Sequence, residues 1–287
     1  MIEPIHLLSL GAGVQSTTLL LMQLAGEFDW TPDAAIFADT GAEGDHVYAQ
    51  VDFLEQEIAG RYPLYRVSAG NLETDLLDAV NKRRGRVANP PFHVINREGT
   101  VGTDGQREHS AGSDLGGMLW RSCTRDYKLD PIRRKMREIH KAAGRRPIVQ
   151  HIGISRDEME RMRESGVKYI TNSYPLVDAK LTRHDCLLWL QRHEYPIPGK
   201  SACHFCPYRS NQGWREMKQS DPATFARAVE FDERLRDGKL PGVTGDAYVH
   251  RSFIPLGMVD LTSAEENGQM GLFGDGLINE CEGLCGV

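Results

Sequence analysis

SLGAGVQST, residues 9–17, is the segment from which the architecture of this chain can be inferred. The apolar run Ile5–Leu8 precedes it and a second run, Thr18–Met22, follows, so a strand, a glycine-rich turn and a helix are predicted. Glycine tolerates positive φ and lets a ligand approach the backbone closely. The N–H groups that open the helix have no partner within it and favour an anion, most often phosphate. The turn therefore predicts a phosphate site, to which Ser16 and Thr17 add hydroxyl donors.

The pattern of this turn differs from two familiar phosphate loops. G-x-x-x-x-G-K-[ST] needs a lysine directly before its Ser or Thr, and Gln15 stands before Ser16. In G-x-G-x-x-G the third glycine would fall on Ser16. The remaining pattern is S-x-G-x-G-x-x-S. The alternative is an ordinary turn between a strand and a helix, in which the glycines serve packing.

The composition is that of a soluble globular protein. The 287 residues are 40% hydrophobic and 26% charged, which allows one large α/β domain. The net charge of −6 argues against a protein that binds nucleic acid over most of its surface, and it is compatible with a local basic patch. No run of eighteen apolar residues and no basic leader with an apolar core is present. We therefore expect a cytoplasmic protein with no membrane partner.

Strands alternate with helices along the first two thirds of the chain, which predicts a doubly wound parallel sheet of the α/β, Rossmann-like class with right-handed crossovers. The expected strands are 5–10, 34–38, 64–67, 148–152 and 169–171, and the expected helices are 16–26, 46–58, 131–143, one that Thr182 caps, and 222–236. Ligands of such sheets lie beyond the carboxyl ends of the strands. Residues 9–16, 39–41 and 153–156 are therefore expected at one edge.

Three consecutive segments are expected in the chain. They are a nucleotide-binding α/β domain at 1–180 with a long insertion at 83–122, a helical segment with cysteines at 181–237, and a glycine-rich tail at 238–287. The insertion is rich in arginine and glycine and has little periodicity, so it is either a solvated excursion or a lid over substrate.

Six cysteines are too few for a disulfide scaffold in a chain of this size, and they favour metal or redox chemistry. Cys203 and Cys206 form a C-x-x-C pair, whose thiolates can bind one metal ion or cluster from a tight turn. A redox C-x-x-C would open a helix after a strand, whereas this pair follows Pro198-Gly199. Cys123 and Cys186 are further candidate ligands. Thiolate ligation suits iron–sulfur and zinc alike, and buried thiols without a metal are the alternative.

The pattern S-x-G-x-G-x-x-S resembles the PP-loop of the adenine nucleotide alpha-hydrolase superfamily, and within it the phosphoadenosine-phosphosulfate (PAPS) reductase-like branch. That loop usually reads S-x-G-G-G-K-D-S, and here Ala12, Val14 and Gln15 replace a glycine, the lysine and the aspartate. The replacements affect phosphate charge pairing and metal binding. The resemblance implies ATP, PAPS or another adenylyl sulfate as the ligand, with Mg²⁺ as a further expectation. The nucleotide-binding positions it implies in the turn are Ser9, Gly11, Ala12, Gly13, Gln15, Ser16 and Thr17.

Two further segments resemble parts of the same family. The segment from Gly153 is similar to its Gly-x-Arg-x-x-Glu-x-x-Arg block, shifted by one residue, which implies that Arg156 and Arg161 clamp phosphate or sulfate. The alternative is a helical turn in which Asp157 pairs with Arg161. Asp39, after the second expected strand, is a candidate for contact with ribose or magnesium, or else an ordinary turn residue at a strand end.

The cysteine blocks resemble the iron–sulfur members of the superfamily, among them adenylyl-sulfate reductases and enzymes of the DNA phosphorothioation type. The reductases hold a four-iron cluster with a Cys-Cys pair followed by C-x-x-C. Here the first pair reads Ser122-Cys123, so one ligand is missing and Cys186 is its natural replacement. The resemblance therefore favours a 4Fe-4S cluster at Cys123, Cys186, Cys203 and Cys206, with zinc as the alternative.

Candidate catalytic residues follow from the same resemblance. Lys128, with Arg125, belongs to a segment similar to the family's Cys-Thr-x-x-x-Lys block and would neutralise sulfate or phosphate, or else it lies on a solvated helix start. PAPS reductases end in Glu-Cys-Gly on a mobile tail whose cysteine attacks sulfur. Glu280-Cys281 is similar, and Cys285 follows. A cluster ligand, a disulfide between these two cysteines and inert thiols are the alternatives.

These resemblances imply an enzyme that binds ATP or an adenylyl sulfate and carries out sulfur transfer or reduction with an iron–sulfur cluster. ATP pyrophosphatase or adenylyltransferase activity is a related expectation, and nucleic-acid thiolation would make a nucleic acid the acceptor. Expected partners are a sulfur or electron donor protein, of desulfurase or thioredoxin-like type, and a second copy in a homo-oligomer. The competing hypothesis is a non-catalytic protein that zinc stabilises and that binds a nucleotide or serves as a nucleic-acid adaptor. Its PP-loop would have lost catalytic activity.

Overall fold

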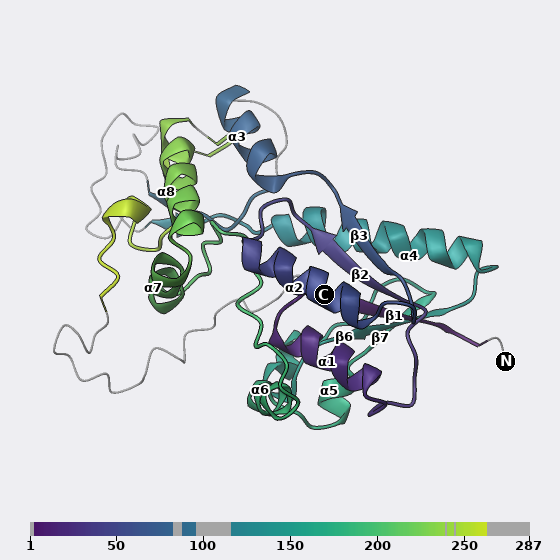
Figure 1. The fold of residues 1–287 in the computed structure, drawn as a ribbon. Helices are drawn as coiled ribbons and strands as arrows, with labels where there is room; N and C mark the ends of the chain where they lie inside the picture. Colours follow the sequence, from purple (N-terminus) through teal and green to yellow (C-terminus); the bar gives the residue numbers. More distant parts are fainter. Residues whose placement is uncertain (1–2, 83–87, 96–115, 239, 244, 263–287) are drawn as a thin grey trace. The chain divides into compact units, whose positions relative to one another are not determined.

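The computed structural model describes residues 3–82, 88–95, 116–238, 240–243 and 245–262 (Figure 1). The described part forms two compact units, one drawn from Met1–Gly70 and Thr124–Ala202 and the other from Asn71–Cys123 and Cys203–Cys281. This division cuts across the three consecutive segments expected from the sequence, because the chain leaves the first unit after Gly70 and again after Ala202.

The first unit contains a five-stranded parallel sheet in the order β3-β2-β1-β6-β7 (Figure 1). Its strands are β1 (Ile5–Leu10), β2 (Ala34–Asp39), β3 (Leu64–Ser68), β6 (Ile148–Ile152) and β7 (Ile170–Ser173). The chain adds β2 and β3 on one side of β1 and then β6 and β7 on the other, so the strand order reverses between β1 and β6. The predicted α/β class and doubly wound parallel sheet are confirmed.

The register aligns the ends of the two central strands. Ser9 of β1 pairs with Ile152 of β6, and Leu10 pairs with Phe37 of β2. The turns that follow β1 and β6 therefore leave the sheet at the same edge. A reversal of strand order at this edge is where open α/β sheets usually bind ligands.

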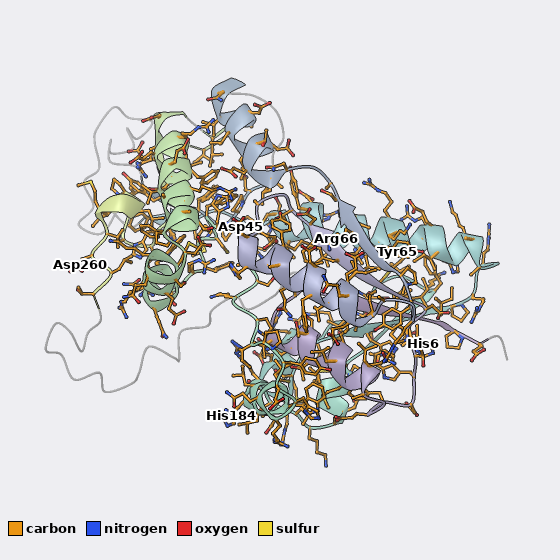
Figure 2. All side chains as sticks on the ribbon, in the orientation of Figure 1. His6, Asp45, Tyr65, Arg66, His184 and Asp260 are labelled. Carbon is orange, nitrogen blue, oxygen red and sulfur yellow. The ribbon has the colours of Figure 1, made fainter. Side chains whose placement is uncertain are left out.

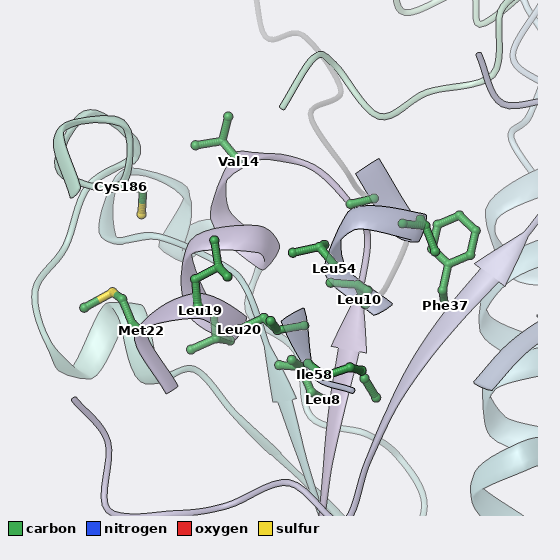
Figure 3. Packing of buried hydrophobic residues seen from close by; sticks show 14 of the residues in the cluster. Leu8, Leu10, Val14, Leu19, Leu20, Met22, Phe37, Leu54, Ile58 and Cys186 are labelled. Atoms are coloured by element: carbon green, nitrogen blue, oxygen red, sulfur yellow. The ribbon is translucent and has the colours of Figure 1, made fainter. Parts of the chain in front are cut away.

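Helices cover both faces of this sheet. They are α1 (Val14–Leu24), α2 (Asp45–Glu57), α4 (Asp130–Ala142), α5 (Pro175–Asp178) and α6 (Arg183–Arg192), with a π-helix (Arg125–Leu129) before α4 and a 3-10 helix (Arg156–Arg161) after β6. Leu8 and Leu10 of β1 pack with α1, α2 and α6 in one apolar cluster (Figure 3). Ile5 and Leu7 pack with α4 in a second cluster, so alternate residues of one strand supply both cores.

The predicted start of α6 is confirmed in detail. Thr182 is its N-cap, and its hydroxyl oxygen accepts from the backbone N–H of Asp185 at 3.2 Å. The carboxylate of Asp185 accepts from the backbone N–H of Thr182 at 2.9 Å, which completes the capping box.

The second unit combines three helices with a small antiparallel sheet. Its elements are α3 (Leu72–Lys82), β4 (His93–Ile95), β5 (Gly117–Met118), α7 (Asn211–Ser220), α8 (Pro222–Asp237), β8 (Asp246–Tyr248) and a 3-10 turn (Leu256–Met258). The strand order is β5-β4-β8, so parts of the expected insertion and of the expected tail pair with each other. Phe205 and Phe231 stack at 3.9 Å between ring centroids in its core. Within the described ranges of both units, no helix has the length and apolar character needed to cross a bilayer.

Candidate functional site

The turn between β1 and α1 has the conformation of an open anion cradle. Ala12 has φ of +57°, a left-handed conformation that usually belongs to glycine. Gly13 is the N-cap of α1 in extended conformation and has no side chain to cap the helix. The hydroxyl of Ser16 accepts from the backbone N–H of Gly11 at 3.2 Å and is 3.3 Å from the carbonyl of Gly13, to which it donates. Ser16 therefore closes the turn while the helix N-terminus keeps its positive end toward the turn.

Gly153, at the end of β6, packs directly on the first turn of α1. A Cβ atom built there would lie 2.7 Å from both the N and the Cα atoms of Ser16 and 3.0 Å from the carbonyl carbon of Gln15. These neighbours are backbone atoms that cannot rotate away. Only glycine allows the turn after β6 to approach the start of α1 this closely.

A pocket of about 560 Å³, part of it open to solvent, lies at this edge of the first unit. Its lining residues are Ser9, Gly11, Gly13, Val14, Gln15, Ser16, Ile152, Gly153, Arg183, Gly199, Lys200 and Ser201. The described lining holds two cationic residues, Arg183 and Lys200, and no carboxylate. Together with the helix N-terminus, this composition favours an anion.

The segment 199–201 borders the pocket and is tied to the first turn. The hydroxyl of Ser201 donates to the carbonyl of Gly11. The Nε2 atom of His46, at the start of α2, lies 3.0 Å from the carbonyl oxygen of Lys200 and donates to it in the Nε2-protonated tautomer. These two contacts hold the segment at the carbonyl group of Lys200 and at the next residue, Ser201.

Gln15 joins the first turn to the 3-10 helix after β6. Its Nε2 donates to the carboxylate of Glu158 at 3.1 Å and is 3.5 Å from the hydroxyl of Ser155. The other carboxylate oxygen of Glu158 pairs with Arg161 at 2.5 Å. Burial raises the pKa of Glu158, and Arg161 acts against that rise. Gln15 stands where the PP-loop that it resembles has an aspartate, and its side chain is hydrogen-bonded to Glu158.

The cations at the pocket differ from those expected. Arg156 is exposed and Arg161 pairs with Glu158, and neither is among the described lining residues. Arg183 and Lys200 line the pocket instead. Sequence reasoning missed both, although Arg183 directly follows a recognisable N-cap. Six of the expected nucleotide-binding positions do meet at the pocket: Ser9, Gly11, Gly13, Gln15, Ser16 and Gly153.

Asp39 and Thr17 have structural contacts outside the described lining. The carboxylate of Asp39 accepts from the backbone N–H of Gly41 at 2.8 Å and from the Tyr48 hydroxyl at 2.9 Å. Burial and this contact raise the pKa of Tyr48. The Thr17 hydroxyl is buried and accepts from Gln50 at 3.4 Å. Asp39 thus has the contacts of an ordinary turn residue at a strand end.

Lys128 lies in the π-helix and is buried. Its Nζ atom is 2.9 Å from a carboxylate oxygen of Glu43, whose side chain is fully buried. The Thr40 hydroxyl donates to the same oxygen at 3.1 Å. The alternative of a solvated helix start is therefore wrong for Lys128, while Arg125 is exposed. Lys128 is not among the described lining residues of the pocket, and this buried pair indicates a role in stability.

The expected cysteine ligands fall into different environments. Cys186 is fully buried beside α1 in the apolar cluster of the first unit (Figure 3). Burial raises the pKa of its thiol to about 12, and a hydrogen bond with Thr18 opposes this. These surroundings are those of a buried core thiol, the alternative expected for cysteines without a metal.

Cys123, Cys203 and Cys206 belong to the second unit and are half-buried. The backbone N–H of Cys206 donates to the carbonyl of Cys203 at 3.0 Å, which places both on one tight turn as predicted. Within the residues that the structure describes, no three His, Cys, Asp or Glu side chains are grouped so that they could hold a metal ion. The four-thiolate site at Cys123, Cys186, Cys203 and Cys206 therefore stays a prediction. Cys281 and Cys285 lie outside them.

Comparison with known proteins finds no matching family model and no significant match among curated proteins. Among solved structures, the chain is similar to phosphoadenylyl-sulfate (PAPS) reductase from Candida auris in a phosphate complex, with 14% identity, 70% of this chain and 81% of that chain covered, and a TM-score of 0.37. It is also similar to the U34-tRNA thiolase NcsA from Methanococcus maripaludis with its 4Fe-4S cluster, with 15% identity, 91% and 84% covered, and a TM-score of 0.38.

Proposed function

We propose that this protein is an enzyme that binds the anionic end of an adenine nucleotide in the pocket at the N-terminus of α1 and uses the nucleotide in sulfur transfer or reduction. The pocket carries the proposal, because it combines an uncapped helix N-terminus with Arg183 and Lys200 and has no carboxylate in its described lining. ATP and adenylyl sulfates are the candidate ligands, since both end in phosphate or sulfate. The adenine and the sulfur chemistry come from the resemblance of residues 9–17 to the PAPS reductase-like loop.

The position of the pocket supports binding of a charged group. It lies beyond the carboxyl ends of β1 and β6, where the strand order reverses. The backbone N–H groups and the dipole of α1 act on an anion there without rearranging. Arg183 offers a planar fork of donors and Lys200 a compact charge. The close packing of Gly153 on Ser16 keeps the cradle in shape.

Metal binding is a separate part of the proposal. The turn with Cys203 and Cys206 is the candidate site for an iron–sulfur cluster or zinc, with Cys123 as a third thiol in the same unit. A sulfate ester or a nucleic acid as acceptor, and a desulfurase or thioredoxin-like donor, also remain proposals that depend on the sulfur chemistry.

The test is a binding titration with ATP, ADP, adenosine 5′-phosphosulfate and adenosine, combined with metal analysis of anaerobically purified protein. We expect the anionic nucleotides to bind more tightly than adenosine. Ser16→Ala removes the hydroxyl that bonds to Gly11 and Gly13, so a looser turn should weaken nucleotide binding about tenfold and leave metal content unchanged. Ser220→Ala, which removes an exposed hydroxyl at the end of α7, is the control.

Two results would contradict the proposal. One is wild-type protein that binds none of the anionic nucleotides. The other is a Ser16→Ala variant that loses metal and keeps its nucleotide affinity. Colourless protein that holds one equivalent of zinc, binds nucleotide and turns over none of it would favour the adaptor hypothesis.

A further inference from the structure

The first turn lacks the positive charge that the loops it resembles carry within themselves. Val14 and Gln15 occupy the positions of their lysine and aspartate. In the described lining, positive charge comes from Arg183 and Lys200, on segments far along the chain. A phosphate or sulfate that loses water on binding needs compensating charge. This charge is therefore supplied from outside the turn.

Lys200 differs from Arg183 in how its backbone is held. The side chain of Arg183 starts on the first residue of α6, whose capping box fixes that helix end. Lys200 lies in the irregular segment 199–201, which no helix or strand holds. Its position depends on the contact of its carbonyl oxygen with His46 and on the bond from Ser201 to Gly11. The held carbonyl group is bonded directly to the Cα atom that carries the lysine side chain.

The imidazole of His46 fits closely against two glycines. A Cβ atom at Gly44 would lie 2.7 Å from its Cε1 atom, and a Cβ atom at Gly199 would lie 2.8 Å from its Cδ2 atom. The ring therefore touches the backbone of its own helix N-cap and the backbone of the 199–201 segment. This fit limits the rotation of the ring and keeps Nε2 directed at the carbonyl of Lys200.

We propose that Lys200, presented by the 199–201 segment, neutralises the anionic end of the bound nucleotide in place of the lysine that the first turn lacks, and that His46 is the positioning residue that holds it. This inference rests on the proposed function, because it assigns a role within the same pocket. His46 acts through the backbone of Lys200 and not by contact with the nucleotide.

The experiment compares ATP with adenosine, which lacks the anionic end, in titrations of the full-length protein. Lys200→Met keeps the aliphatic stem and removes the charge, and it should weaken ATP binding roughly 10- to 100-fold without changing adenosine binding. Lys200→Arg should keep most of the ATP affinity. Lys141→Met, on an exposed position of α4, is the matched control and should behave like wild type.

A second set of variants tests the positioning role of His46. His46→Ala should weaken ATP binding roughly 3- to 10-fold, and His46→Gln, whose amide nitrogen can donate in place of Nε2, should restore most of that loss. Adding His46→Ala to Lys200→Met should cause no further loss, because His46 acts through Lys200. His184→Ala, at an exposed position of α6 (Figure 2), is the control.

The two proposals fail in distinguishable ways. Wild-type protein that binds no anionic nucleotide overturns the proposed function and this inference with it. Wild-type protein that binds ATP, together with a Lys200→Met variant of equal ATP affinity, overturns the role of Lys200 alone. A Lys200→Met variant that loses adenosine and ATP binding equally also overturns it, because the effect is then not on the anion. Additive losses in the double variant overturn the role of His46.

Discussion

Replacing Gly153 by alanine should both destabilise the first unit and weaken nucleotide binding. The new Cβ atom would lie 2.7 Å from two backbone atoms of Ser16, about 0.7 Å short of the 3.4 Å at which ordinary contact begins. Gly153 is not among the residues with positive φ, so the difficulty is one of space alone. Either the start of α1 or the turn after β6 must move, and both line the pocket.

Forced overpacking of this kind costs about 1–3 kcal/mol, which corresponds to a fall in Tm of roughly 4–8 °C at the middle of that range. The assay is thermal unfolding of Gly153→Ala, followed by an ATP titration well below its Tm. Gly117→Ala is the control, because a Cβ atom there meets nothing within 4 Å. A Gly153→Ala variant with wild-type Tm and wild-type ATP affinity would refute the close packing of these two turns.

Further predictions concern buried groups of the first unit. Lys128→Met should lower the free energy of unfolding by about 3–5 kcal/mol, because it leaves the buried carboxylate of Glu43 without its partner. Adding Glu43→Gln should recover part of that stability, and denaturant unfolding measures both effects. Cys186→Ala should leave metal content unchanged, and the thiol should resist alkylation until the protein is denatured; iron loss in the variant would contradict this. Burial, with the ring of Trp30 stacked on it, lowers the pKa of His151 from 6.5 to about 3 in the folded protein. As pH falls below 6.5, His151 therefore becomes protonated in the unfolded state while it stays neutral in the folded state. Stability should therefore fall by about 1.4 kcal/mol per pH unit between these values as pH decreases, and His151→Gln should flatten the profile.

Long apolar strands made the first unit predictable. β1 and β2 are almost fully buried, and such strands are typical of parallel sheets covered on both faces. The antiparallel sheet of the second unit was not predicted, because β5 has two residues and β4 three, too few to show alternation. Its pairing of His93 with Tyr248 also joins positions far apart in the chain.

The sequence predicts the parts of the pocket that local backbone requirements determine. It does not predict the parts that tertiary packing brings to the pocket. The turn at Gly11 and Gly13 and the glycine at 153 follow from local requirements for backbone approach. Arg183 and Lys200 reach the pocket only through the packing of α6 and of the 199–201 segment, which no periodicity reveals. A cation between Gly199 and Ser201, both small residues, was the one local signal that could have drawn attention to that segment.

The interleaving of the two units along the chain constrains how the protein can be synthesised and shortened. During translation the pocket at the N-terminus of α1 cannot be complete until Ser201 has left the ribosome. By then residues 71–123 of the second unit have been synthesised and the rest of that unit, from Cys203 onward, has not. A fragment that stops near residue 180 would contain the whole central sheet and still lack Arg183 and Lys200. Shortened forms for binding studies should therefore extend at least to Ala202, and removal of the intervening stretch 71–123 would need a linker from Gly70 to Thr124.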